Sequence, residues 1–150
     1  GGFPVGAVMA KAEVGDAMVP GTHGSTFGGN PLAMRSANAV LELLLENNFL
    51  SNLRKMIVYF DKKMDELIKN DMQNNPIIFA KKGSGMLRGF QLNEIVTAGD
   101  FSNIAREKSL LLVGAAENTI RLLPPLNTSK EEVDNAFDIL NDIVLELKKT

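Results

Sequence analysis

The stretch Gly21-Thr22-His23-Gly24-Ser25-Thr26-Phe27-Gly28-Gly29-Asn30-Pro31 (GTHGSTFGGNP) joins a glycine-rich loop to the start of a helix. Clustered glycines let backbone N–H groups converge on one point, and three hydroxyl side chains add donors beside it. Asn30 is a good N-cap residue and Pro31 suits the first helical position. The stretch therefore predicts an anion site with phosphate as its natural ligand, although composition alone also allows a turn-rich connector.

The segments on either side of this loop differ in pattern. Upstream, Val5–Ala10 reads as a short apolar strand and Lys11–Gly21 as a loop. Downstream, apolar residues at helical spacing predict one helix from Pro31 to about Asn47. A second apolar stripe predicts a helix from about Ser51 to Asn70.

The last 75 residues or so change to a shorter period, which indicates strands. Apolar runs of strand length occur four times, at Ile77–Ala80, Gly85–Leu92, Leu110–Val113 and Thr119–Leu123. Lys82–Gly85 reads as a turn and Phe101–Lys108 as a short helix. A capping box, with either Thr128 or Ser129 as the cap, predicts a final helix with one apolar stripe.

The resulting order is strand, loop, two helices, then β-β-α-β-β-α. This order predicts an α+β fold in which helices pack on one face of a small sheet. The chain has 150 residues, a size that can bury a real core. Its net charge of -2 gives no basic field for nucleic acid or an anionic membrane. The lack of cysteine excludes disulfides and thiolate metal sites, and suits a cytoplasmic protein.

Two motifs carry a resemblance to a known family. Gly1–Ala7 (GGFPVGA) followed by Pro20–Ala33 (PGTHGSTFGGNPLA) closely resembles the class III pyridoxal-phosphate (PLP) aminotransferases. Gly83–Leu92 and Ile120–Leu126 (IRLLPPL) fit the same family, so the resemblance spans essentially the whole chain. Within the family, the likeness is greatest to acetylornithine aminotransferases, followed by ornithine aminotransferases.

The resemblance implies roles for three residues. Thr26, with Ser25 beside it, matches the position that binds the cofactor phosphate of the neighbouring subunit. Arg121 matches the arginine that grips the substrate α-carboxylate, and a guanidinium can do so with two parallel hydrogen bonds. Without the resemblance, Thr26 could equally hold a turn and Arg121 could be a surface residue. No catalytic residue is expected within the chain.

The resemblance also implies how the chain relates to a longer enzyme. The catalytic lysine would lie about four residues before Gly1, so the chain is expected to be a C-terminal part that is inactive alone. Residues 1–30 would be a remnant of the large PLP-binding domain. Residues 31–150 would form a linking helix and the C-terminal small domain.

The intact enzyme would be a homodimer that moves an amino group from N2-acetylornithine to 2-oxoglutarate. Three alternative amino donors stay open: ornithine, succinyl-diaminopimelate and 4-aminobutyrate. A non-catalytic α+β module that binds a phosphorylated ligand also stays open.

Other polar residues are interpreted as structural. His23 lacks a recognisable catalytic partner and reads as a structural donor. Lys11 follows the GGFP motif and reads as a solvated loop residue rather than the cofactor lysine. The lysine pairs at 62–63, 81–82 and 148–149 read as solvated faces. No set of His, Asp and Glu has metal-ligand spacing.

Overall fold

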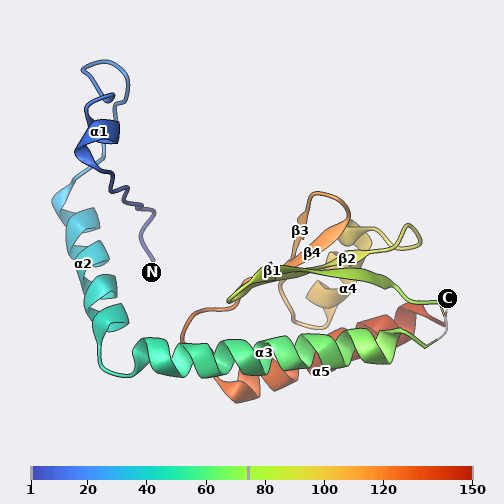
Figure 1. Cartoon of the computed structure of the whole chain (residues 1–150). Coiled ribbons are helices and arrows are strands. Elements are labelled where there is room, and N and C mark those ends of the chain that lie inside the picture. Colours follow the sequence, from blue (N-terminus) through green and yellow to red (C-terminus); the bar gives the residue numbers. More distant parts are fainter. Residues whose placement is uncertain (1, 74, 150) are drawn as a thin grey trace. The chain divides into compact units, whose positions relative to one another are not determined.

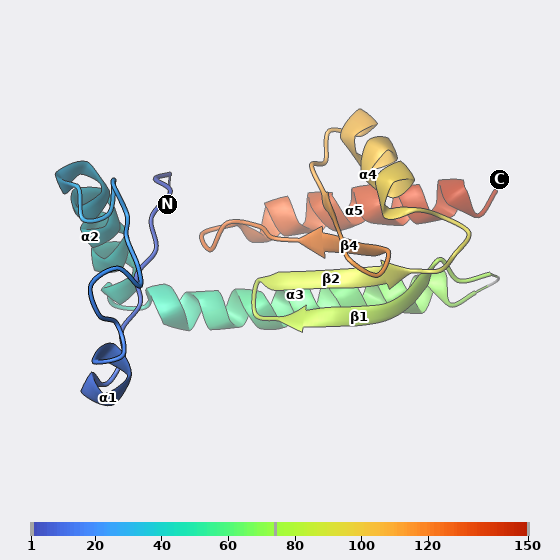
Figure 2. The same cartoon turned by 90° about the horizontal axis from the view of Figure 1, so that it is seen from above.

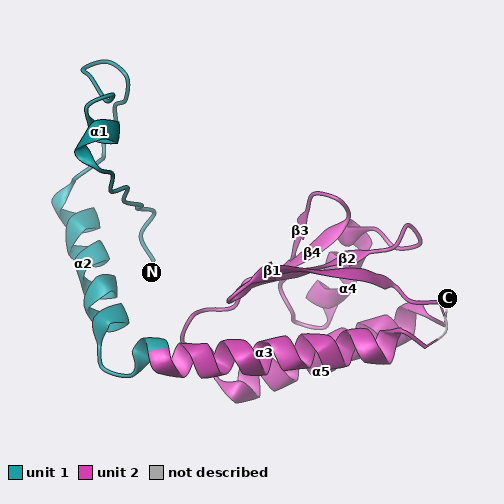
Figure 3. Cartoon of the chain, in the orientation of Figure 1, with its two compact units in different colours: residues 1–50 teal, residues 51–150 magenta. Residues whose placement is uncertain are grey.

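A computed structural model describes residues 2–73 and 75–149. The chain divides into two compact units, residues 1–50 and residues 51–150 (Figure 3). The helix that follows the glycine-rich loop falls in the first unit, together with that loop. The division of an intact enzyme at residue 30 stays a prediction. No helix among the described residues is both long and apolar enough to cross a membrane.

The first unit contains two helices, α1 (Ala12–Gly15) and α2 (Pro31–Leu45). The predicted start of α2 is confirmed, because the Asn30 side chain accepts a hydrogen bond from the Ala33 N–H at 2.9 Å. The strand predicted at Val5–Ala10 is wrong, since these residues form no ladder in the described chain, and a strand needs a partner. The loop predicted after it contains the single turn of α1.

Helix α2 is rich in apolar residues but does not build a core within its own unit. Ala33 is its only buried residue. Leu32 is 66% exposed and Leu45 is 78% exposed. The described residues of this unit therefore leave most of the apolar surface of α2 in contact with solvent.

The second unit follows the predicted order. Its elements are α3 (Phe49–Asp71), β1 (Ile78–Ser84), β2 (Leu87–Leu92), α4 (Ala98–Glu107), β3 (Val113–Ala115), β4 (Thr119–Leu122) and α5 (Lys130–Leu147). The strands form one antiparallel sheet in the order β1-β2-β4-β3 (Figures 1 and 2). The three helices lie on one side of this sheet, so the predicted α+β fold is confirmed (Figure 1).

Two predicted elements differ from the structure. β1 extends to Ser84, so only Gly85 of the turn expected at Lys82–Gly85 lies in the actual turn. Gly83 stays paired with β2 although its φ is left-handed, at 88°. The strand expected at Leu110–Val113 begins only at Val113. Leu110 and Leu112 instead pack against the core, which explains their apolar character.

The core lies between the sheet and the helices. Phe90 and Ile120 are paired residues of β2 and β4, and both are fully buried. Phe90 meets Phe101 of α4 edge to face at 5.4 Å, and Phe60 of α3 meets Phe137 of α5 in the same way at 5.3 Å. Such pairs add about 0.5–1.5 kcal/mol beyond the apolar area they bury.

The N-cap of α5 is Ser129, one of the two residues predicted for this position. The Ser129 hydroxyl accepts from the Glu132 N–H at 3.1 Å, and the Glu132 carboxylate accepts from the Ser129 N–H at 2.7 Å. These bonds lower the pKa of the Glu132 carboxyl below its ordinary value. Thr128 adds a hydrogen bond to the same carboxylate instead of serving as the cap.

Asn118 ties the start of β4 to the loop before α4. Its side-chain oxygen accepts from the Ala98 N–H at 2.7 Å, and its side-chain nitrogen donates to the carbonyls of Asn93 and Val96 at 2.8 Å each. Its own carbonyl accepts from the Leu92 N–H at 2.8 Å. With a φ of 49°, Asn118 also supplies the left-handed conformation that the β3–β4 turn requires.

We expect Asn118→Gly to lower the free energy of unfolding by about 1–3 kcal/mol, because it removes three side-chain bonds but tolerates the left-handed backbone. Urea unfolding would be followed by the fluorescence of Tyr59, since the chain has one tyrosine and no tryptophan. Asn75→Gly is the control, because Asn75 also has a positive φ (50°) but is exposed. Equal effects of the two changes would contradict a special role for the Asn118 side chain.

Candidate functional site

The glycine-rich loop owes its conformation to particular glycines. Gly21 and Gly29 have left-handed φ angles of 92° and 71°. At Gly28, an added Cβ would lie 2.9 Å from both Cβ and Oγ of Ser25. A larger residue at position 28 would therefore occupy the space next to the Ser25 hydroxyl.

The hydroxyl groups of the loop are in two different states. Thr22 donates its hydroxyl to the Val19 carbonyl at 2.7 Å and so holds the loop itself. Within the described residues, the hydroxyls of Ser25 and Thr26 make no hydrogen bond, and both residues are exposed. These two hydroxyls are free to donate to a ligand.

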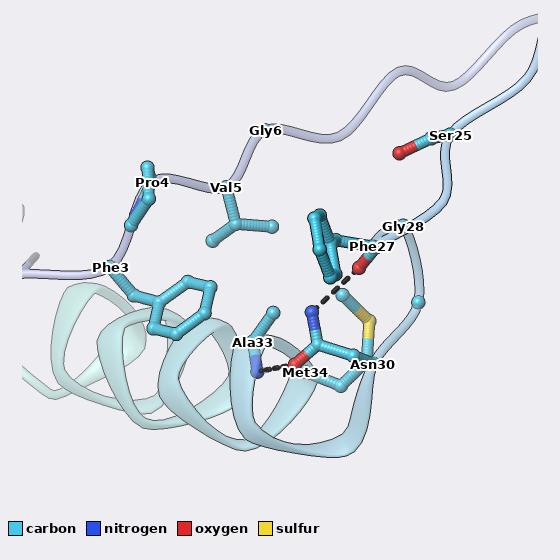
Figure 4. Close-up of a pocket in the computed structure, with 11 residues that line it drawn as sticks. Phe3, Pro4, Val5, Gly6, Ser25, Phe27, Gly28, Asn30, Ala33 and Met34 are labelled. Atoms are coloured by element: carbon cyan, nitrogen blue, oxygen red, sulfur yellow. Dashed lines mark hydrogen bonds between the residues drawn. The ribbon is translucent and has the colours of Figure 1, made fainter.

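A hollow of about 500 Å³ lies beside this loop in the first unit (Figure 4). Ser25 and Phe27 line it from the loop, Phe3 and Val5 from the N-terminal segment, and Met34 from α2. Thr26 does not line it. The Asn30 side chain, which also donates to the Phe27 carbonyl at 2.6 Å, fixes the loop to the N-terminus of α2.

The loop residues fit a phosphate group. The donor set consists of two adjacent unpaired hydroxyls, and Gly28 keeps the space beside one of them open. Both hydroxyls lie a few residues ahead of the N-terminus of α2, where the helix dipole favours an anion. The chemistry of the donor set is thus the one that a phosphorylated cofactor requires.

Arg121 lies in the second unit, on β4. Its neighbours Ile120 and Leu122 are buried under the helices, so Arg121 points to the opposite, uncovered face of the sheet. It is exposed, and no ion pair of Arg121 occurs among the described residues. Its guanidinium is therefore available for a carboxylate.

Several lysines predicted to be solvated are engaged in ion pairs. Lys63 lies 3.0 Å from the Asp134 carboxylate, and Lys148 lies 2.9 Å from the buried Asp71 carboxylate. Lys81 pairs with two aspartates of α3, and Lys82 pairs with Glu117. The prediction of plain solvated faces is wrong for these residues, because their partners are distant in sequence.

Lys11 is exposed, as expected for a solvated loop residue. His23 is also exposed and its side chain makes no hydrogen bond in the part of the chain that the structure describes, so its interpretation as a structural donor is wrong. Among the described residues, no group of three or more His, Asp and Glu could hold a metal ion.

Sequence reasoning did not single out Gly89, the residue that separates Lys82 from Arg121 on the sheet. A glycine inside a strand pattern is a signal for close backbone approach, and could have drawn attention to it.

The loop suits a protein that binds a phosphorylated cofactor, and comparison with known families specifies the class of protein. The aminotransferase class-III family matches residues 1–144. The chain belongs to this family of PLP-dependent enzymes. The family assignment predicted from the motifs is confirmed.

Curated relatives include acetylornithine aminotransferase 1 of Bradyrhizobium diazoefficiens, 39% identical over 91% of this chain and 32% of the relative. Acetylornithine aminotransferase 2 of Caulobacter vibrioides is 40% identical over 91% of this chain and 33% of the relative. The chain thus spans about one third of the length of these relatives.

Solved structures of aminotransferases are also similar to this chain. Acetylornithine aminotransferase from Elizabethkingia anophelis is 30% identical over 92% of this chain and 36% of that one, with a TM-score of 0.74. Ornithine δ-aminotransferase from Plasmodium falciparum is 26% identical over 95% of this chain and 35% of that one, with a TM-score of 0.80. Both share the fold of this chain.

Proposed function

We propose that this chain is part of an aminotransferase that moves the amino group of N2-acetylornithine to 2-oxoglutarate. The observation that carries the proposal is the family match over residues 1–144, supported by relatives named acetylornithine aminotransferase at 39% and 40% identity. We further propose that the intact enzyme is a homodimer, as the resemblance implies, and that it is cytoplasmic, which the lack of cysteine suits. The free hydroxyls of Ser25 and Thr26 and the unpaired guanidinium of Arg121 suit this chemistry.

Each of these residues has a distinct part in the proposal. Ser25 and Thr26 donate hydrogen bonds to the cofactor phosphate, which in the homodimer would belong to the neighbouring subunit. Arg121 holds the α-carboxylate with two parallel bonds, and both the amino acid and the 2-oxo acid carry that group. When bound, PLP supplies the electron sink for the charge that develops at the substrate α-carbon.

Ornithine is the second candidate for the amino donor. The similarity to ornithine δ-aminotransferase from Plasmodium falciparum, with a TM-score of 0.80, favours it. The test is to measure kcat/KM of the full-length enzyme for N2-acetylornithine, ornithine, succinyl-diaminopimelate and 4-aminobutyrate, each with 2-oxoglutarate. A higher value for any other donor than for N2-acetylornithine would overturn the proposed substrate. A protein that binds PLP but transfers no amino group would support the non-catalytic alternative.

We expect Thr26→Ala in the full-length enzyme to weaken PLP retention by about 1.5–3 kcal/mol, because it removes a hydrogen bond to a dianion. The measurement is the PLP dissociation constant, read from cofactor absorbance during dialysis or titration. Thr22→Ala is the matched control, since the Thr22 hydroxyl is already used by the Val19 carbonyl. If both threonine variants retain PLP like the wild type, the phosphate role of Thr26 is wrong.

A further inference from the structure

Three residues form a row across the uncovered face of the sheet. The strand register pairs Lys82 of β1 with Gly89 of β2, and Gly89 with Arg121 of β4. Side chains of laterally paired residues point to the same face, so Lys82 and Arg121 flank the glycine on the face that Arg121 occupies. With strands about 4.8 Å apart, the two Cα atoms are separated by about 10 Å.

Gly89 keeps the space between these two cations open. An added Cβ at position 89 would lie 2.7 Å from the Ile120 carbonyl oxygen, so a side chain there would displace β4. A hollow of about 180 Å³ lies at this point, lined by Lys82, Gly89 and Arg121 among others. Two long cationic side chains can therefore reach over the same empty space.

Of the two cations, only Lys82 has an ion-pair partner among the described residues. Lys82 is paired with Glu117, which has a left-handed φ of 55° in the β3–β4 turn. The hydrogen bond and the charge of Lys82 lower the pKa of the Glu117 carboxyl below its ordinary value. The side chains of this pair are 37% and 70% exposed, and exposed ion pairs are weak enough for another anion to compete.

We propose that Lys82 and Arg121 form a two-cation site for small dicarboxylates, in which Glu117 occupies Lys82 until the second carboxylate of the ligand displaces it. The proposal rests on the proposed function, because it takes Arg121 as the group that binds the first carboxylate. A monocarboxylate needs only Arg121. A dicarboxylate reaches both cations across Gly89, so Lys82 determines specificity for the ligand with two carboxylates.

The test is an NMR titration of the 150-residue chain with acetate and with succinate at constant ionic strength. The amide of Gly89 and the side-chain Nε–H of Arg121 report binding. We expect succinate to bind more tightly than acetate. Lys82→Met should weaken succinate binding about two- to fivefold without changing acetate binding. Glu117→Gln should tighten succinate binding by a similar factor, because it removes the competing carboxylate.

Lys69→Met is the control, because it removes one positive charge from an exposed position of α3. It should leave the ratio of succinate to acetate affinity unchanged. A wild-type chain that does not distinguish succinate from acetate would overturn the proposal, as would Lys82 and Glu117 variants with the wild-type ratio. Arg121→Met distinguishes a failure of the proposed function from a failure of the second cation. If it weakens the binding of both anions while the Lys82 variant changes nothing, the carboxylate role of Arg121 stands and only the role of Lys82 is wrong. If Arg121→Met weakens neither anion, the proposed function fails at Arg121.

Discussion

Arg121→Ala in the full-length aminotransferase is expected to lower kcat/KM both for the amino donor and for 2-oxoglutarate. The fall should correspond to a loss of about 3 kcal/mol or more of transition-state stabilisation. The two substrates present the same α-carboxylate, so the loss of one bidentate partner affects both half-reactions. The exposed guanidinium on the uncovered face of the sheet, with no ion pair among the described residues, is available for this contact. The measurement is steady-state kinetics with each substrate varied in turn.

Three comparisons separate this result from general damage to the fold. Arg121→Lys should recover little activity, because an ammonium group cannot reproduce the planar fork of a guanidinium. PLP retention should stay close to the wild type. Arg54→Ala removes an exposed arginine from α3 and should leave the kinetics unchanged. Wild-type kinetics for Arg121→Ala would mean that the arginine is a surface residue.

The elements that the sequence predicts well are those with strong local signals. The α3 stripe places Phe60, Met64 and Leu67 in the core, as its helical spacing indicates. α5 starts where its capping box predicts. The N-cap of α2 is likewise a local signal, because Asn30 and the N–H that it caps are only three residues apart.

The elements that the sequence predicts poorly depend on partners elsewhere in the chain. Val5–Ala10 has the composition of a strand, but a strand forms only where another can pair with it. The apolar run at Leu110–Val113 reads as a strand, but Leu110 and Leu112 pack on the core and the strand begins only at Val113. Lys82 is predicted to be solvated, because its ion-pair partner Glu117 lies 35 residues away in the sequence. The same holds for Gly89, whose importance depends on the register of two neighbouring strands.

The pair formed by Asp71 and Lys148 is another contact that local sequence does not reveal. Asp71, at the end of α3, is only 1% exposed, and one of its oxygens accepts from the Ile78 N–H at 2.6 Å. Its other oxygen lies 2.9 Å from the Lys148 ammonium, an ion pair that lacks the geometry of a well-directed hydrogen bond. Lys148 also donates to the carbonyls of Asp71 and Gln73, so it neutralises the C-terminal end of the α3 dipole.

We expect Lys148→Met to lower the free energy of unfolding by about 3–5 kcal/mol, because it leaves the buried Asp71 carboxylate without its counter-charge. Urea unfolding of the 150-residue chain, followed by Tyr59 fluorescence, would measure the loss. Tyr59 is a suitable probe because its hydroxyl donates to Asp134 of α5, across the contact between α3 and α5. Lys62→Met is the control: Lys62 is 70% exposed and pairs with Glu66, so its loss should cost less than about 1 kcal/mol.

The double variant Asp71→Asn/Lys148→Met distinguishes the ion pair from simple packing. If the cost of Lys148→Met comes from an uncompensated buried charge, then removing that charge as well should restore part of the stability. The double variant should therefore be more stable than the sum of the two single changes predicts. Additive effects would show that Lys148 acts through its contacts with the carbonyls at the end of α3, rather than through the Asp71 carboxylate. Under both explanations Lys148, the C-cap residue of α5, contacts the C-terminal end of α3. The loss of Lys148 should therefore loosen both helix ends together.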